Sequence, residues 1–372
     1  MMKILHVSKL YFPFMGGIET VVKDLVEEQA KSLEVERVDV LAFSETNTTE
    51  KIDVSCKTNI IKSSSIFKFA STDVSLSFPY HWIRVRNKYD VVHVHVPNPI
   101  ACFCLAVLPP KGSVVVHWHS DIVKQKWLKI LHFPFQHLLL SKSNRIIVTS
   151  LPYLEGSKDL RNFVNKVDVV PIGIDKNMRD ENLDVTANLK NKYKDKKVVF
   201  ALGRHVGYKG FDVLIKSCQY LPDDYIVLLG GGGPLTDSYK SEIKNLGLEG
   251  KIELVGKIPE SELNSYYQAC DLFVLPSVDK AEAFGVVQLE AMSQGKPIVC
   301  CDIPGSGVPW VNSSEITGKI SKVSSPEDLA EKIIQVAEHH YDREEIINYF
   351  ENNFSRHNMS LETLRVYNDV IN

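Results

Sequence analysis

Short apolar runs rich in β-branched residues recur along this chain, and segments of helical length separate them. They span residues 3–8, 35–43, 90–96, 113–118, 144–150 and 166–170 in the first half, and 197–202, 225–230, 251–255, 271–275 and 297–301 in the second. Several are apolar throughout, which is typical of strands buried on both faces of a parallel sheet. Strands that alternate with helices predict an α/β fold.

The chain is long enough for two such sheets, since its 372 residues exceed the usual size of one domain. Residues 176–197 are polar and separate the two halves. We therefore predict an N-terminal Rossmann-like domain over residues 1–175 and a C-terminal Rossmann-like domain over residues 176–354. We expect the amphipathic segment 355–372 to pack back on the first domain. Ligands of open α/β sheets bind beyond the carboxyl ends of the strands, so a cleft between the halves is the expected site.

Composition excludes several classes of protein. Hydrophobic residues make up 44% and charged residues 24%, which rules out a disordered or collagen-like chain. The net charge of -3 shows no basic excess, so we expect no nucleic-acid partner. We find neither an apolar run of bilayer length nor a signal peptide, and expect a cytoplasmic protein. The seven cysteines include no C-x-x-C pair, which argues against a disulfide framework and a zinc site.

The most specific motif lies at residues 282–292 and reads Glu-Ala-Phe-Gly-Val-Val-Gln-Leu-Glu-Ala-Met. Its two glutamates would not share one helix face, because eight residues leave about 80° of rotation. If Gly285 opens the helix, Glu282 lies in the loop and Glu290 in an early turn. Both can then face a ligand at the helix N-terminus, where free backbone N–H groups favour anions. A loop glutamate and a solvated helix glutamate are the alternative.

Four further segments complete a pattern. They are residues 14–20 with their Gly-Gly pair, residues 116–121 (Val-His-Trp-His-Ser-Asp), residues 203–210 (Gly-Arg-His-Val-Gly-Tyr-Lys-Gly) and residues 254–259. In this order, and with the glutamate pair, they resemble the motifs of the GT4 family of retaining glycosyltransferases. The resemblance covers nearly the whole chain. It implies the GT-B fold, in which two Rossmann-like domains face each other across a cleft, and transfer of a hexose from a nucleotide sugar with retention.

Two loops carry residue types that suit a diphosphate. Arg204 and Lys209 lie in a glycine-containing loop after a strand, where a flexible backbone lets cations reach phosphates. Their charge would stabilise the leaving nucleoside diphosphate, and we expect both side chains to be partly exposed. Gly16 and Gly17 precede a helix, which permits close approach of a phosphate or sugar. Solvated cations and an ordinary turn are the alternatives.

The resemblance also assigns roles to the glutamate motif and its neighbours. Glu290 would bind the ribose hydroxyls, and Glu282 would hydrogen-bond the transferred sugar. The segment from Gly256 to Ile258 would line the base. The other expected donor contacts are Phe284, Gly285 and Val286.

Histidines alternate along two of the predicted strands, as His93 with His95 and as His117 with His119. Such pairs can indicate a metal site, but no carboxylate or thiolate accompanies them at ligand spacing, and we expect none. The resemblance implies metal-independent catalysis without any cofactor. It also implies that His119 contacts the donor sugar near the reacting carbon, with His117 ranked lower. Asp121 is a candidate for orienting the acceptor or the histidine.

Residues 122–145 combine five Lys and Arg residues with aromatic and aliphatic ones and contain no acidic residue. This composition suits an anionic membrane surface. A crossover helix that packs on the sheet with its lysines in solvent is the alternative. Because many relatives in the GT4 family use lipid-linked acceptors, we expect a lipid-linked glycan acceptor and a peripheral position on the inner face of the cell membrane.

The identity of the sugar donor is the most detailed expectation from the sequence. The His-Trp-His-Ser-Asp-Ile string at residues 117–122 most resembles enzymes of bacterial surface-polysaccharide assembly, including O-antigen mannosyltransferases. GDP-mannose is therefore the first donor, with a UDP-hexose close behind. Among other classes, a Rossmann oxidoreductase would need a G-x-G-x-x-G loop after the first strand, which Met15-Gly16-Gly17 does not fit. An inert sugar-binding scaffold is the remaining alternative, and the intact glutamate pair and loop cations argue against it. In this family the leaving phosphate deprotonates the acceptor, so the protein needs no general base.

Overall fold

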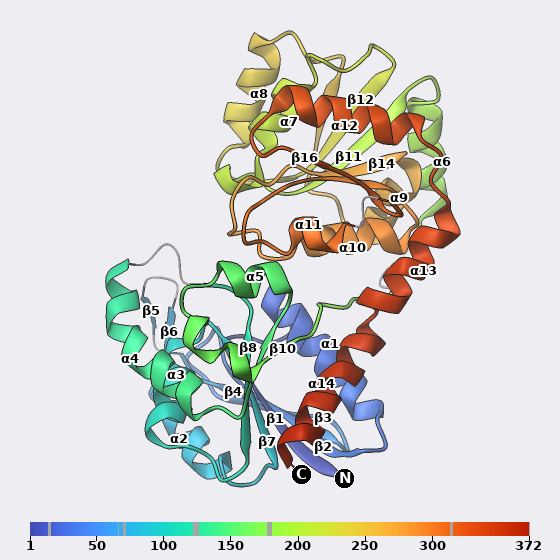
Figure 1. The fold of residues 1–372 in the computed structure, drawn as a ribbon. Helices are drawn as coiled ribbons and strands as arrows, with labels where there is room; N and C mark the ends of the chain where they lie inside the picture. The colour runs from blue at the N-terminus through green and yellow to red at the C-terminus, as the bar shows by residue number, and fades with distance from the viewer. Residues whose placement is uncertain are drawn as a thin grey trace. The chain divides into compact units, whose positions relative to one another are not determined.

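The computed structural model describes residues 1–13, 16–65, 67–69, 72–121, 126–176, 181–312 and 315–371. The chain forms two compact units, residues 1–173 together with 356–372, and residues 174–355. Each unit is built on a parallel sheet with helices packed against it (Figure 1). The predicted α/β class is therefore confirmed.

The sheet of the N-terminal unit has the strand order β10-β9-β8-β7-β1-β2-β4-β3. Its strands are β1 (Met2–Val7), β2 (Val35–Phe43), β3 (Glu50–Ser55), β4 (Thr58–Ser63), β7 (Val91–Val96), β8 (Ser113–Trp118), β9 (Arg145–Val148) and β10 (Val167–Val169). A separate hairpin pairs β5 (Phe67–Phe69) with β6 (Thr72–Val74). Only β3 of the large sheet is antiparallel to its neighbour, among the strands that the structure describes. Every residue of β7 is buried, including His93 and His95 between its valines.

Most helices of this unit connect strands of its sheet, and the C-terminal helix follows the second unit. They are α1 (Gly17–Lys31), α2 (Ser77–Val85), α3 (Pro99–Val107), α4 (Lys126–Lys142), α5 (Leu151–Gly156) and α14 (Arg356–Ile371), with a 3₁₀ turn η1 (Arg161–Lys166). Local sequence fixes several helix starts. The Asn98 side chain, for example, accepts a hydrogen bond from the N–H of Ala101, which caps α3. Trp82 and Trp118 are among the largest fully buried side chains.

The sheet of the C-terminal unit has the order β13-β12-β11-β14-β15-β16. Its strands are β11 (Lys197–Arg204), β12 (Tyr225–Gly232), β13 (Ile252–Gly256), β14 (Leu272–Leu275), β15 (Ile298–Cys301) and β16 (Gly318–Ser321). The strand order reverses at β11, because β12 and β13 extend the sheet one way and β14 to β16 the other. In open α/β sheets such a reversal marks where ligands bind.

Helices and a 3₁₀ turn precede, connect and follow these strands. They are α6 (Leu183–Lys192), η2 (Gly207–Lys209), α7 (Phe211–Ser217), α8 (Thr236–Asn245), α9 (Glu260–Ala269), α10 (Val286–Ser293), α11 (Val308–Val311), α12 (Pro326–Glu338) and α13 (Arg343–Phe354). Helices α7 and α12 pack on the sheet through a continuous apolar core that includes Phe211, Leu214 and Ile333.

The C-terminal helix α14 belongs to the N-terminal unit, as predicted. Its first residue, Arg356, lies 3.4 Å from a carboxylate oxygen of Asp24 and 3.3 Å from one of Glu27, both on α1. Further along α14, Tyr367 is fully buried. The helix is therefore held to this unit by ion pairs at its start and by apolar burial along its length.

Candidate active site

The loops that follow β11 and β14 touch each other at the carboxyl edge of the C-terminal sheet. Gly210 has φ +65°, and a Cβ there would lie 2.1 Å from the carbonyl oxygen of Pro276. The N–H of Val278 donates a hydrogen bond of 2.9 Å to the carbonyl of Tyr208. Only glycine allows this approach and this backbone conformation together. The two loops are thereby fixed side by side at the point where the strand order reverses.

This contact brings Lys209 and Glu282 together. The Lys209 Nζ atom lies 2.5 Å from Glu282 Oε2, and the two side chains are 10% and 12% exposed. The expectation that Lys209 is partly exposed was therefore wrong. From the sequence, a lysine in a glycine-rich loop is expected to be exposed to solvent. In the structure, the loop after β14 encloses Lys209 and supplies a carboxylate partner. A buried ammonium group requires such a partner.

Two serines that the sequence analysis did not single out hold Glu282. The Ser277 hydroxyl donates to Glu282 Oε2 at 3.0 Å, and the Ser306 hydroxyl donates to the Glu282 backbone carbonyl at 2.5 Å. Ser277 directly follows β14, but Ser306 lies 24 residues beyond Glu282 along the chain. No sequence signal marks a serine at that separation, because only the tertiary fold brings it near.

Arg204 ends β11 at the same edge, and its side chain is exposed. The expectation for this cation agrees with the structure, unlike that for Lys209. Ile258 follows β13 and covers Gly230, whose added Cβ would lie 2.8 Å from Ile258 Cδ1. The loops after β11, β13 and β14 thus all carry predicted site residues at one edge of one sheet.

Helix α10 begins at the glycine that the motif predicts. Gly285 is its N-cap with φ +74°, so Glu282 lies in the preceding loop and Glu290 on the helix. Glu290 accepts a 3.0 Å hydrogen bond from the Tyr267 hydroxyl and lines a small pocket with Lys176.

The residues around this helix start differ in exposure. The Phe284 ring is 3% exposed and packs against Trp310 and Phe354, so it contributes to the core. The buried Phe284 ring is therefore not available to a ligand, and the Phe284 carbonyl accepts a 2.9 Å hydrogen bond from the Gln288 side-chain amide. Val286 is the first residue of α10 and is partly buried.

The N-terminal unit carries the glycine pair after β1. Gly16 is the N-cap of α1, and its carbonyl accepts hydrogen bonds from the N–H and the hydroxyl of Thr20. A Cβ at Gly17 would meet no atom within 4 Å, so protein packing does not require a glycine there. Phe14 and Met15 of this motif lie outside the described residues.

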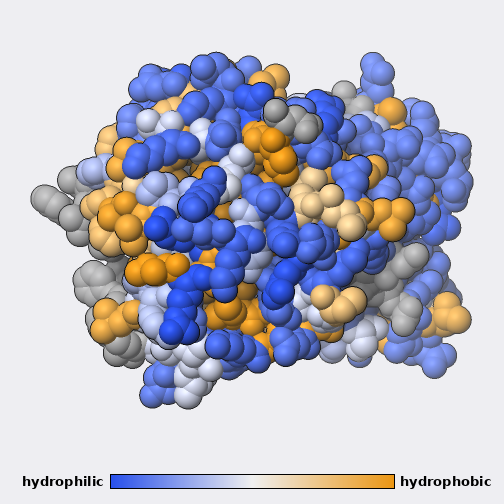
Figure 2. All heavy atoms as spheres, turned by 90° about the horizontal axis from the view of Figure 1, so that it is seen from below, coloured by the Kyte–Doolittle hydropathy of each residue, from blue (hydrophilic) through white to orange (hydrophobic). Residues whose placement is uncertain are grey.

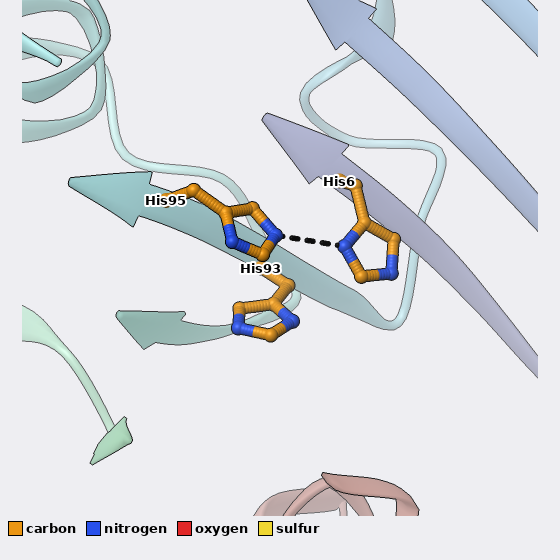
Figure 3. Close-up of side chains that lie close together, drawn as sticks. All are labelled: His6, His93 and His95. Carbon is orange, nitrogen blue, oxygen red and sulfur yellow. Dashed lines mark hydrogen bonds between the residues drawn. The ribbon is translucent and has the colours of Figure 1, made fainter. Parts of the chain in front are cut away.

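Five buried histidines gather on β1, β7 and the end of β8. His6 pairs with His93, and His95 with His117, across neighbouring strands. His6 Nδ1 lies 3.0 Å from His95 Nε2, and His95 Nδ1 lies 2.9 Å from His119 Nε2. Figure 3 draws the first of these contacts as a dashed line. Burial lowers the pKa of His6 to about 4 and that of His119 to about 3, so the rings are neutral at pH 7.

The ring nitrogens of two triplets, His6 with His93 and His95, and His95 with His117 and His119, lie within 4.8 Å of one another. Imidazoles are common ligands of transition metals. Both triplets consist of neutral histidines alone, and in each triplet a ring nitrogen is already shared with another histidine. A divalent ion here would be buried without an anionic ligand, which is costly.

The acceptor-side candidates differ in their surroundings. Both His117 ring nitrogens are buried without a hydrogen-bond partner among the described residues, and the ring stacks on His119 at 4.0 Å. The Asp121 carboxylate accepts hydrogen bonds from the Trp118 indole at 3.1 Å and the Ser157 hydroxyl at 2.9 Å. Asp121 thus ties the end of β8 to the segment after α5.

The basic segment 122–145 is only partly described. Lys124 lies outside the described residues, and the side chains of residues 126–132 are likewise not described. Lys142, the last residue of α4, donates to the carbonyl of Ala106 at 3.0 Å, and Arg145, the first residue of β9, pairs with Asp168 at 3.6 Å. In the part of the chain that the structure describes, we find no helix long and apolar enough to cross a membrane.

Exposed apolar side chains lie on α4 and on the neighbouring α3. Phe133 and Leu138 on α4 are 44% and 38% exposed, and Phe103 and Val107 on α3 are 46% and 50% exposed. The two helices are in contact, and the Phe103 ring packs edge-on against Phe135. Figure 2 shows hydrophobic patches interspersed among hydrophilic side chains on the face it presents.

Both halves of the chain match families of known enzymes. Residues 15–177 match "Glycosyltransferase Family 4", and residues 186–353 match "Glycosyl transferases group 1". A solved structure of the Anabaena protein Alr3699/HepE in complex with UDP is 18% identical, covers 99% of this chain and all of its own, and has a TM-score of 0.76. The two sheets thus form the GT-B fold of glycosyltransferases.

Relatives of nearly full length narrow the class. O-antigen chain mannosyltransferase C of Escherichia coli is 28% identical over 95% of this chain and 93% of its own length. D-rhamnosyltransferase WbpZ of Pseudomonas aeruginosa is 27% identical over 93% of this chain and 89% of its own. This chain belongs to the GT4 family, and it is an enzyme of the retaining hexosyltransferase class.

Proposed function

We propose that this enzyme transfers mannose from GDP-mannose, with retention, to a lipid-linked or oligosaccharide acceptor in bacterial surface-polysaccharide biosynthesis. The observation that carries the proposal is the buried Lys209–Glu282 pair at the strand reversal of the C-terminal sheet. The names of the two relatives of nearly full length support the sugar, since D-rhamnose is 6-deoxy-D-mannose and both sugars share one ring configuration.

Cations of the loop after β11 bind the negatively charged diphosphate of the donor. Arg204 is exposed at the strand end and is free to reach the diphosphate. Lys209 adds positive charge from the same loop, although Glu282 partly balances it. As the bond to the sugar breaks, negative charge grows on the leaving diphosphate, and these cations stabilise it. No metal ion is required in this proposal, because the protein supplies the charge.

The two glutamates bind different parts of the donor beyond its diphosphate. Glu290 binds the ribose hydroxyls, and Glu282, held by Ser277 and Lys209, binds the transferred sugar. A carboxylate with fixed partners keeps its orientation as the transition state forms. The other donor contacts in this proposal are Gly16, Gly17, Ile258 and the backbone at Phe284, Gly285 and Val286.

The N-terminal unit supplies the sugar and acceptor side. His119, 7% exposed, contacts the transferred sugar near the reacting carbon. Asp121 orients the acceptor or the loop that carries His119, and His117 supports His119 by ring stacking. The leaving phosphate takes the acceptor proton, so the protein needs no general base.

The N-terminal unit also binds the membrane surface in this proposal. The exposed apolar residues of α3 and α4 lie together, as the ring contact between Phe103 and Phe135 illustrates, and α4 falls within the basic segment 122–145 of the sequence. Apolar side chains beside lysines suit an anionic bilayer surface. We propose a peripheral position on the cytoplasmic face of the cell membrane, where a lipid-linked acceptor is found.

A thermal-shift screen with GDP-mannose, UDP-glucose, UDP-galactose, UDP-N-acetylglucosamine and NAD tests the donor. A ligand that binds only the native state raises the apparent stability. We expect the largest shift with GDP-mannose. A larger shift with a UDP-sugar would favour the UDP-hexose alternative, and a shift with NAD alone would contradict the proposed reaction.

A further inference from the structure

A continuous hydrogen-bonded chain runs from helix α1 to His119. Gln29 Oε1 lies 2.9 Å from His6 Nε2, His6 Nδ1 lies 3.0 Å from His95 Nε2, and His95 Nδ1 lies 2.9 Å from His119 Nε2. Figure 3 shows the central link, with the His6 and His95 rings turned toward each other from neighbouring strands. Gln29, His6 and His95 are each at most 1% exposed, so water does not compete for these bonds.

The chain has one direction, because its first atom can only accept. Gln29 Oε1 is a carbonyl oxygen, so His6 must donate through Nε2. A neutral imidazole carries one proton, so His6 Nδ1 is bare and His95 donates to it through Nε2. The same step repeats at His95, whose bare Nδ1 accepts from His119 Nε2. His119 is therefore protonated on Nε2 and bare on Nδ1.

At the Gln29 end of this hydrogen-bonded chain, the contacts of Tyr367 support the orientation of the Gln29 amide. The Tyr367 hydroxyl lies 2.5 Å from His93 Nδ1 and 3.4 Å from Gln29 Nε2. When Tyr367 donates to His93, its oxygen is left to accept from the Gln29 amide nitrogen. The amide oxygen of Gln29 then faces His6. Helix α14 thus contributes, through Tyr367, to the proton arrangement at His119.

Burial supports the neutral state on which this direction depends. It lowers the pKa of His6 to about 4 and that of His119 to about 3. The pKa of His95 is also lowered well below its ordinary value, by burial and by the neighbouring histidines. At pH 7 each ring in the chain therefore carries a single proton.

We infer that Gln29, His6 and His95 are positioning residues that hold His119 in the Nε2–H tautomer and present its Nδ1 as a hydrogen-bond acceptor to a substrate hydroxyl. The inference rests on the proposed function where it assigns His119 to the sugar. His119 is 7% exposed, and its Nδ1 is not among the enclosed unpartnered atoms, unlike both ring nitrogens of His117. Nδ1 is the ring nitrogen that the chain leaves available.

The tautomer is directly measurable in the free protein. In protein labelled with ¹⁵N in its histidine rings, long-range proton–nitrogen correlation spectra separate a bare nitrogen from a protonated one. A His119→Gln variant identifies the His119 signals. We expect His119 to be protonated on Nε2 and bare on Nδ1. Protonation on Nδ1 would overturn the inference, and so would stoichiometric metal in the purified protein, because a metal would occupy ring nitrogens that the chain needs.

A matched set of variants tests whether the chain sets this state. His6→Leu leaves His95 Nε2 without a hydrogen-bond partner, whichever way the hydrogen bonds between the histidines run. Both tautomers of His119 then become populated. We expect kcat to fall about two- to tenfold, which is at most about 1.4 kcal/mol. His6→Gln keeps a donor for Gln29 and an acceptor for His95, so it retains the tautomer and most of kcat. His81→Leu replaces a buried histidine of α2 outside the chain and leaves the tautomer unchanged.

The two readouts separate this inference from the proposed function. If wild-type protein transfers no sugar from any nucleotide donor, the proposed function fails, and the spectra still report the tautomer. If a folded His6→Leu protein keeps a pure Nε2–H tautomer and full kcat, the inference fails while the proposed function stands. If His6→Leu does not fold, the wild-type and His6→Gln spectra carry the test.

Discussion

The Lys209 ammonium group and the Glu282 carboxylate form a 2.5 Å ion pair that joins the loop after β11 to the loop after β14. Each residue is also a proposed ligand of the donor, so the pair ties diphosphate binding to sugar binding. Breaking a buried pair on one side leaves an uncompensated charge, which is more costly than replacing both partners. Changes at this pair therefore affect stability as well as ligand binding.

Arg204 and Lys209 should respond differently to removal of their charge. Arg204→Ala should weaken GDP binding about ten- to hundredfold without lowering Tm, because the side chain is exposed and loses only charge-assisted hydrogen bonds. Lys209→Met should weaken GDP binding and also destabilise the protein by about 3–5 kcal/mol, since Glu282 stays buried and unpaired.

Isothermal titration and thermal unfolding measure both effects. Lys190→Ala, an exposed lysine of α6, is the matched control and should change neither quantity. The double variant Lys209→Met/Glu282→Gln should regain most of the lost stability. Unchanged GDP affinity in both Arg204→Ala and Lys209→Met would show that the loop after β11 does not bind the diphosphate.

Chelation of metal should leave transfer intact. Protein cations at the diphosphate take over the charge-neutralising role that a metal ion has in other transferases. The initial rate of GDP release from GDP-mannose in the presence of acceptor, measured with and without EDTA, should agree within about twofold. Complete loss with EDTA that magnesium or manganese restores would contradict this account.

Acid should destabilise the N-terminal unit through its histidine cluster. The unfolded histidine pKa is about 6.5, whereas burial lowers the folded pKa of His6 to about 4 and that of His119 to about 3. Below pH 6.5 the unfolded state therefore binds protons that the folded state does not. The stability that these neutral rings contribute is fully present above pH 6.5 and is lost as pH falls toward 4.

Urea unfolding between pH 7.5 and 5, followed by signals of the N-terminal unit, measures this loss. Each buried histidine contributes a slope of up to about 1.4 kcal/mol per pH unit. His93→Leu should make the slope shallower by about that amount, because burial holds the His93 pKa well below its ordinary value. A stability that does not change between pH 7 and 5 would contradict neutral burial of the cluster.

Membrane contact should depend on the apolar surface of α3 and α4. Phe103→Ser and Phe133→Ser together should reduce co-sedimentation with vesicles of anionic phospholipid at least about threefold, since each removes exposed apolar area. Leu183→Ser changes an apolar residue of α6 that is 72% exposed and should leave binding unchanged. Equal binding by the Phe103/Phe133 variant and wild type would place the membrane contact elsewhere.

Much of the fold could be predicted from the sequence, because parallel strands buried on both faces carry continuous apolar runs. Each run predicted from the sequence overlaps a strand of the structure. The edge strand β3 (Glu50–Ser55) was missed because most of its residues are exposed and polar. Strand β16 (Gly318–Ser321) was missed as well, since it is short and reads Gly-Lys-Ile-Ser.

The candidate site was predictable in its residue types but not in its pairings. The glutamate motif indicated Gly285 as a helix start, and the structure agrees. The Lys209–Glu282 pair and the link from His6 to His95 join residues far apart in sequence, and their contacts exist only once the sheets form. Sequence spacing alone therefore predicted a solvent-exposed lysine and did not predict the contacts between the histidines.

The glutamate pair provides the most direct test of the donor site. Glu290 should hold the ribose, which is present in both GDP and GDP-mannose, and Glu282 should hold the transferred sugar, which is present only in GDP-mannose. Glu290→Gln should therefore weaken binding of both ligands. Glu282→Gln should leave GDP affinity nearly unchanged and lower kcat about ten- to two-hundredfold, the equivalent of one hydrogen bond to a charged group. It should also lower Tm, because Lys209 loses its buried carboxylate partner.

The deciding measurement is isothermal titration of GDP, beside steady-state transfer from GDP-mannose, for wild type, Glu282→Gln, Glu290→Gln and the exposed control Glu249→Gln. We predict that GDP binding is lost only in Glu290→Gln, that turnover falls in both motif variants, and that the control matches wild type. Equal damage to GDP binding by both motif variants would show that the two roles are misassigned. Full activity in both would contradict the proposed site.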